Sequence, residues 1–176
     1  MKPHTIPTLL AAAVLLSAKA GNLCKPGERV VESCTGKHKI ASVCASPQLT
    51  PSKGYLQYRF GTSKKIELTI PATPQPVSSY VHADHFSGTG GGLTYFGFQH
   101  GDFSYVFYTY WRKPDWAANP DNPSCHGPCD GNGMAVMHAG AVISKLACER
   151  GSEGSPLSND EIDALGITPS DDMIVE

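Results

Sequence analysis

The sequence predicts an all-β protein: an antiparallel sandwich or barrel of about eight strands, stapled by disulfides and followed by a short C-terminal helix. Short runs of β-branched and aromatic residues alternate with turn-forming residues along most of the chain. The 176 residues include 18 glycines and 14 prolines without a fixed period, which favours many turns over a helical bundle. The six cysteines form an even number, as in disulfide frameworks.

Residues 1–20 have the pattern of a secretory signal peptide. Lys2 is followed by a short apolar run, Leu9 to Leu16, and by the small-x-small sequence Ala18-Lys19-Ala20. That run is far shorter than the roughly 20 residues that span a bilayer. We therefore expect cleavage before Gly21 and a periplasmic or secreted protein without a membrane anchor.

The remaining chain divides into a β-domain, residues 21–148, and an acidic tail, residues 149–176. The tail holds eight acidic residues and one basic residue. Ser158 and Glu161 have the spacing of a capping box, and Gly166 follows, so a short helix is expected between them. The formal charge of the whole chain is −2, which argues against binding to nucleic acid.

The cysteines are expected to form three disulfides. In an exported chain this is the first interpretation of an even count, although six cysteines allow 15 pairings. We expect a local Cys125–Cys129 bridge, and a bond from Cys148 to an N-terminal cysteine. The cysteines concerned are Cys24, Cys34, Cys44, Cys125, Cys129 and Cys148. The alternative for the local pair is a zinc site with His126 or His138.

The expected strands form four consecutive pairs, with one further strand at residues 79–86. They cover residues 29–34 and 40–44, 55–60 and 66–70, 79–86, 93–99 and 102–111, and 135–138 and 141–148. With His100-Gly101 as a two-residue turn, Phe98 would face Phe103 and Phe96 would face Tyr105. Residues 111–133 are rich in Pro, Asn, Asp and Gly and are expected to form a long loop.

The segment Ser87 to Gly92 is the first candidate site. It contains only Ser, Gly and Thr between two apolar strands, which is typical of a recognition loop or of a flexible connection. His82 and His85 are a weaker candidate for metal binding, because residues three apart lie on opposite faces of a strand. A secreted hydrolase using Ser87 and Asp84 is the least favoured alternative, since no nucleophile motif surrounds the serine.

The run SGTGGGLTYFGFQHGDFSYVFYTYW, residues 87–111, resembles the bacterial periplasmic lysozyme inhibitors, in particular those acting on invertebrate-type lysozymes. CTGKHKIASVCAS, YLQYRFG and AVMHAGAVISKLAC resemble other parts of the same family, so the resemblance covers residues 34–70 and 82–148. It implies an exported β-protein, without enzymatic activity or cofactor, that binds a lysozyme-type cell-wall hydrolase. By position, Ser87, Gly88 and Tyr95 would contact that partner. The alternative is an envelope module that binds a small ligand or metal.

Overall fold

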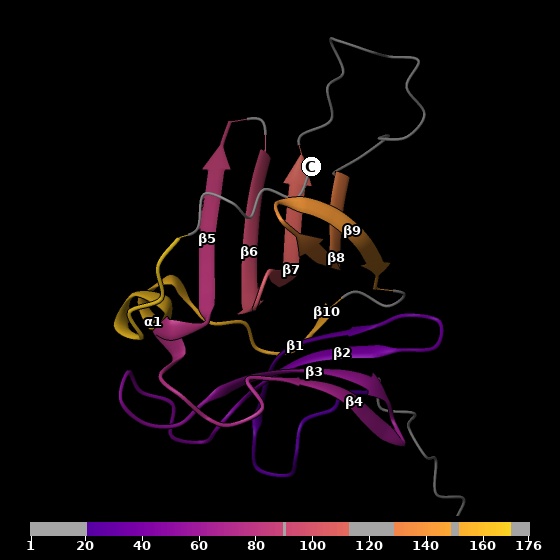
Figure 1. Ribbon diagram of the computed structural model, residues 1–176. Helices are drawn as coiled ribbons and strands as arrows, with labels where there is room; N and C mark the ends of the chain where they lie inside the picture. Colours follow the sequence, from indigo (N-terminus) through magenta and orange to yellow (C-terminus); the bar gives the residue numbers. More distant parts are fainter. Residues whose placement is uncertain (1–20, 90, 113–128, 149–151, 170–176) are drawn as a thin grey trace, which may run out of the picture.

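The fold is a β-sandwich, which confirms the predicted class. The computed structural model describes residues 21–89, 91–112, 129–148 and 152–169. These residues form two antiparallel sheets of five strands each, and the sheets do not close into a barrel. In Figure 1 the strands of the second sheet stand across those of the first, and their far ends extend beyond it.

The first sheet has the strand order β10-β1-β2-β3-β4. Its strands are β1 (Arg29–Thr35), β2 (Ile40–Ala45), β3 (Leu56–Thr62), β4 (Lys65–Ile70) and the two-residue β10 (Ser152–Glu153). Both hairpins expected in this part of the chain are present, with β1 paired to β2 and β3 paired to β4. Strand β10 comes from the acidic tail, so the tail contributes to the fold and is not only a solvated end.

The second sheet has the order β5-β6-β7-β8-β9. After the 3-10 turn η1 (Val77–Ser79), its strands are β5 (Val81–Gly88), β6 (Gly91–His100), β7 (Phe103–Arg112), β8 (Cys129–His138) and β9 (Ala141–Ala147). The β8–β9 hairpin turns at Ala139 and Gly140, both with positive φ, as the sequence predicted for this pair of strands.

The predicted register of the β6–β7 hairpin was wrong by two residues. The turn is Gly101-Asp102, so Phe98 faces Tyr105, while Phe103 faces His100. Gly101 has φ +60°, which suits the first position of a tight hairpin turn. A shift of two residues leaves every side chain on the face predicted for it, because side chains alternate along a strand.

The expected loop 111–133 is shorter than predicted, because β8 begins at Cys129. Its glycines at 131 and 133 are in the ladder opposite Tyr110 and Tyr108. A β-carbon at either glycine would overlap the facing tyrosine ring, so the rings lie against the glycines. Glycine normally weakens a strand, and these aromatic contacts replace the packing that its missing side chain would supply.

The main core lies between the sheets. Tyr58 is fully buried at its centre, with ring centroids 5.9 Å from Phe98, 5.1 Å from Tyr105 and 6.0 Å from Phe107. Burial, and secondarily the neighbouring Tyr105, raises the pKa of the Tyr58 phenol far above its usual range. These ring contacts couple β3 to β6 and β7 and so fix how the two sheets are stacked.

The C-terminal helix α1 (Asn159–Ala164) has the predicted capping box. The Ser158 hydroxyl accepts a hydrogen bond from the backbone N–H of Glu161, whose carboxylate accepts one from the N–H of Ser158. Gly166, with φ +66°, follows the helix, and Leu165 and Ile167 are buried in the main core. In this way the core holds a helix that is too short to be stable alone.

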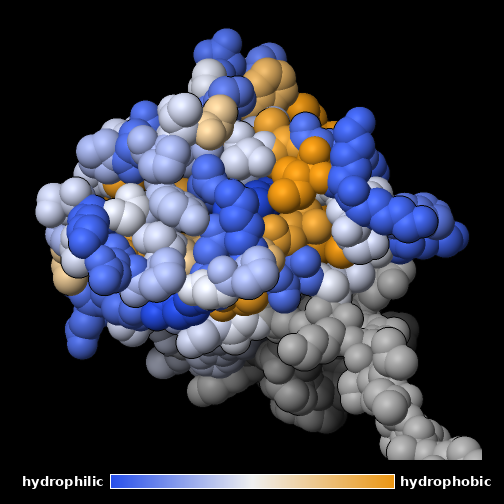
Figure 2. All heavy atoms as spheres, turned by 90° about the horizontal axis from the view of Figure 1, so that it is seen from below, coloured by the Kyte–Doolittle hydropathy of each residue, from blue (hydrophilic) through white to orange (hydrophobic). Residues whose placement is uncertain are grey.

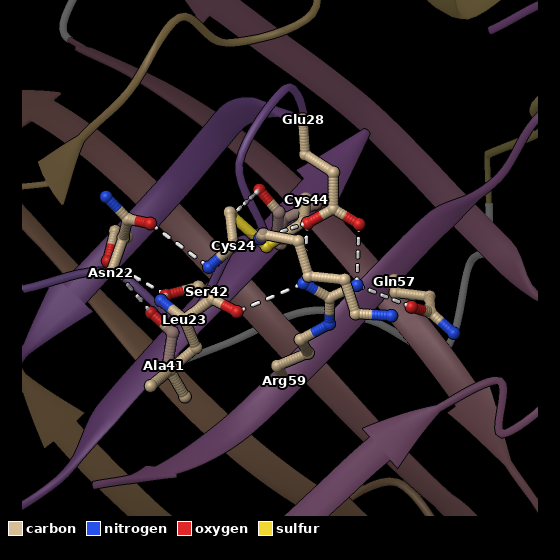
Figure 3. Close-up of a disulfide and its surroundings, with 12 residues drawn as sticks. Asn22, Leu23, Cys24, Glu28, Ala41, Ser42, Cys44, Gln57 and Arg59 are labelled. Atoms are coloured by element: carbon tan, nitrogen blue, oxygen red, sulfur yellow. Dashed lines mark hydrogen bonds and ion pairs between the residues drawn. A yellow bond between two sulfur atoms is a disulfide. The ribbon is translucent and has the colours of Figure 1, made fainter. Parts of the chain in front are cut away.

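Two disulfides join elements that are distant in the sequence. Cys34 bonds Cys148, in agreement with the expectation that Cys148 reaches an N-terminal cysteine, and Cys24 bonds Cys44. Figure 3 shows the Cys24–Cys44 bridge at the N-terminal segment, close to Arg59. The expected Cys125–Cys129 bridge lies outside the described residues, as does the alternative zinc site.

Candidate binding surface at the distal end of the second sheet

The second sheet extends beyond the first at one end, which we call the distal end: residues 85–88, 91–94, 109–112 and 129–132 of its first four strands. In Figure 1 this end stands clear of strands β1 to β4. The inner face is the one that carries Phe96 and Phe107 into the main core. On the inner face of the distal end the first sheet provides only partial cover, and His85, Ser87 and Thr94 are exposed.

The candidate segment 87–92 is the tip of a hairpin and not an irregular loop. Ser87 pairs with Gly92, and Gly88 pairs with Gly91, so the β5–β6 ladder continues through the segment. Because these residues have small side chains or none, the hairpin is thin where it ends. Phe86, directly beside the tip, is 70% exposed and is the most exposed large apolar side chain of the described residues.

Tyr95 does not lie beside Ser87. It pairs with Asp84, three positions along the ladder from the Ser87–Gly92 pair. Because side chains alternate between the faces of a sheet, this odd spacing places Tyr95 on the outer face. Tyr95 is only 8% exposed and packs with Val106 and Met137 in a second, smaller core. The two site residues expected to act together are thus on opposite faces, and Tyr95 is a core residue.

Sequence reasoning missed the exposed aromatic residues of the distal end. Trp111, on the inner face, is 40% exposed, and Tyr110, on the outer face, is 38% exposed. A β-carbon at Gly92 would overlap the indole of Trp111, so this ring lies against the glycine facing it in the ladder. The sequence does contain a signal for these exposed rings, namely Gly91-Gly92 and an aromatic-rich strand. It can be used only when it is known that Gly92 faces Trp111.

A small cavity opens on the inner face, below the level of Trp111. Its walls come from Thr94 and Thr109 on the second sheet, and from Val31 and Leu157 on the opposite side. The volume is about 50 Å³, enough for a methyl-sized or acetyl-sized group. Buried Phe96 and Phe107 line it as well, so an apolar interior lies beneath a rim that carries hydroxyl groups.

The histidines expected to bind a metal are not brought together. His82 and His85 lie on opposite faces of β5, and His85 is near the side-chain amide of Asn159, with 3.5 Å between the nitrogens. The Nδ1 atom of His82 is buried and finds no hydrogen-bond partner among the described residues. Asp84 lies on the face opposite Ser87, and its carboxylate accepts the backbone N–H of His85 at 2.7 Å. The structure therefore does not bring Ser87 and Asp84 together.

Among the described residues, one group of three potential metal ligands comes close together: Cys24, Glu28 and Cys44. The two cysteines are bonded to each other, so neither provides a thiolate for a metal ion. This group is part of the structure that holds the N-terminal segment.

Comparison with protein-family models, with curated proteins and with solved structures finds no match to this chain. In the part of the chain that the structure describes, no helix is long and apolar enough to cross a membrane.

Proposed function

We propose that this protein is exported to the periplasm or the medium, where it binds and inhibits a lysozyme-type cell-wall hydrolase without catalysing a reaction itself. The contact is made by the distal end of the second sheet, led by Ser87 and Gly88 at the hairpin tip. The two disulfides support the export step, since such bonds form and persist in oxidising compartments.

The observation that carries the proposal is the shape of the tip. The β5–β6 hairpin ends in Ser87, Gly88, Gly91 and Gly92, so its free β5 edge carries little side-chain bulk and can enter a cleft, while β7 pairs with Gly91 and Gly92 on the other side and keeps the tip extended. A preformed strand pair loses little conformational entropy on binding, which favours affinity. The Ser87 hydroxyl can donate a hydrogen bond to a carboxylate in such a cleft.

Tyr95, which was expected to contact the partner, has a supporting part in this proposal. Because it is buried, it supports the tip from within the sheet. The exposed Phe86, which precedes Ser87 in β5 and lies on the opposite face of the hairpin tip, replaces it as the aromatic side chain available to a partner. Aromatic side chains at the centre of an interface often contribute most of its affinity.

The test is inhibition of cell-wall clearing by a panel of chicken-, goose- and invertebrate-type lysozymes. We expect inhibition of at least one type, unchanged by a chelator. Ser87→Ala should weaken inhibition about tenfold at an unchanged melting temperature, whereas the matched control Ser144→Ala, an exposed serine in β9, should leave both unchanged. If no lysozyme is inhibited, or if the two variants behave alike, the proposal is wrong.

A further inference from the structure

Trp111 forms a flat aromatic surface on the inner face of the distal end. Gly92, opposite it in the ladder, leaves room for the indole to lie against the sheet. The ring is 40% exposed, so part of it is available to a ligand. An aromatic ring held in this orientation offers its electron-rich face to a flat ligand.

Hydroxyl groups and the small cavity lie next to this ring. Thr109 is two residues from Trp111 on the same face of β7, at a spacing of roughly 7 Å. Thr94 faces Thr109 across the ladder, and both line the cavity of about 50 Å³. Its interior is apolar, with Phe96 8% and Phe107 4% exposed.

The charge of this surface excludes one class of flat ligand. Of the described side chains at the cavity and around the exposed ring, Glu32 supplies a carboxylate and none is a lysine or arginine. Single-stranded nucleic acids also stack on aromatic residues, but they need a positively charged groove along the backbone. An uncharged ligand with a flat apolar face and many hydroxyl groups fits these side chains better.

We propose that the inner face of the distal end binds an oligosaccharide of β-linked N-acetylhexosamine. One pyranose ring stacks its C–H face on Trp111. The acetamido group enters the cavity, where its methyl contacts the apolar interior and its amide exchanges hydrogen bonds with the hydroxyls of Thr94 or Thr109. This is a binding activity separate from lysozyme inhibition, and it needs no partner protein.

The experiment compares two trisaccharides with the same β-1,4 linkage. Tri-N-acetylchitotriose carries the acetamido groups, and cellotriose has hydroxyls in their place. Trp116→Phe, which leaves Trp111 as the only tryptophan, is the background for a fluorescence titration. We expect saturable binding of tri-N-acetylchitotriose with a shift in Trp111 emission, and at least tenfold weaker binding of cellotriose.

Variants then assign the site, with calorimetry as the readout. Trp111→Ala should abolish binding, and Trp111→Phe, which keeps an aromatic ring at this position, should weaken it. The matched control is Tyr110→Ala, which removes a ring of similar exposure from the opposite face and should leave affinity unchanged. Thr109→Ile narrows the cavity mouth and should weaken binding of the acetylated sugar alone.

Three results would overturn the proposal: no saturable binding by the unsubstituted protein, equal affinity for the two sugars, or full affinity in Trp111→Phe and Trp111→Ala alike. Because no lysozyme is present, these results are independent of the inhibition assay. If Trp111→Phe weakens lysozyme inhibition while neither sugar binds, the ring belongs to a protein contact and the glycan site is excluded.

Discussion

The guanidinium of Arg59 forms a two-pronged ion pair with the carboxylate of Glu28, with N–O distances of 2.6 and 2.7 Å. Their side chains are only 1% and 4% exposed. Arg59 also donates to the backbone carbonyl of Leu23 at 3.0 Å, and Figure 3 shows these groups together. The pair therefore fastens the N-terminal segment across the outer face of the first sheet, beside the Cys24–Cys44 bridge.

The side of the molecule that carries this pair has both hydrophilic and apolar areas. Seen from below, hydrophilic residues cover most of the first sheet's side of the protein, and apolar residues gather in one neighbouring area (Figure 2). A buried charge is costly unless it is paired. The N-terminal segment can therefore pack against the first sheet over Arg59 only because Glu28 neutralises the guanidinium.

Replacement of Glu28 by Gln should destabilise the fold strongly. The substitution leaves a buried guanidinium without its counter-charge, for which we expect a loss of about 3 kcal/mol in the free energy of unfolding. The matched control is Glu67→Gln, which breaks the pair between Lys39 and Glu67, side chains that are 37% and 36% exposed. That change should cost less than about 1 kcal/mol. Urea unfolding measures both, and equal losses would contradict the assignment.

Stability should fall in acid because of Glu28. Burial raises the pKa of this carboxyl, but hydrogen bonds from Arg59, Tyr55 and the backbone of Lys25 outweigh it and hold the pKa at about 2. A carboxyl whose pKa is lower in the folded state stabilises the fold above its unfolded pKa, and this contribution is lost as pH falls from about 4.5 to about 2.

Urea unfolding measured across this pH range tests that linkage. The free energy of unfolding of the unsubstituted protein should decrease steadily with falling pH. In Glu28→Gln this part of the decrease should be absent, because the group that titrates has been removed. The same slope in both proteins would mean that other carboxyl groups cause the acid sensitivity.

The two disulfides should stabilise to different extents. Cys34 and Cys148 are separated by 114 residues, and Cys24 and Cys44 by 20. In the loop-entropy model the longer bridge contributes roughly 5 kcal/mol and the shorter one roughly 3 kcal/mol. Removing each pair as a double Ala variant and comparing denaturant midpoints tests this order. A greater loss on removal of Cys24–Cys44 would show that the shorter bridge acts mainly in the native state, through the N-terminal segment.

Gly101→Val should destabilise the β6–β7 hairpin. At φ +60° a β-branched residue is strained, and we expect a loss of about 1–2 kcal/mol. His100→Val is the control, because this exposed position of β6 is extended backbone that accepts a β-branched residue, and it should retain most of the stability. Thermal unfolding distinguishes the two, and equal melting temperatures would contradict the turn assignment.

Export can be checked directly by intact-mass analysis. We expect the exported form to begin at Gly21, because Ala18-Lys19-Ala20 precedes it. Met1 retained in the exported fraction would contradict the signal-peptide interpretation.

Local patterns predicted the elements whose causes are local. The helix could be located from Ser158, Glu161 and Gly166 because a capping box and a C-terminal glycine act within a few residues. The hairpins were found because strand-forming runs and turn residues lie side by side in the chain. The faces predicted for the side chains of β6 and β7 are also correct, because side chains alternate along a strand whatever its neighbours are.

The properties that depend on which residues face one another could be found only from the folded structure. The β6–β7 register was missed by two residues because both registers bury the same faces, and only the full ladder selects one. The resemblance assigned Tyr95 to the partner contact, but this side chain is buried because Val106 and Met137 from two other strands pack against it. The placement of the Trp111 ring depends on Gly92, almost twenty positions away, because the ladder sets the ring against a residue without a side chain.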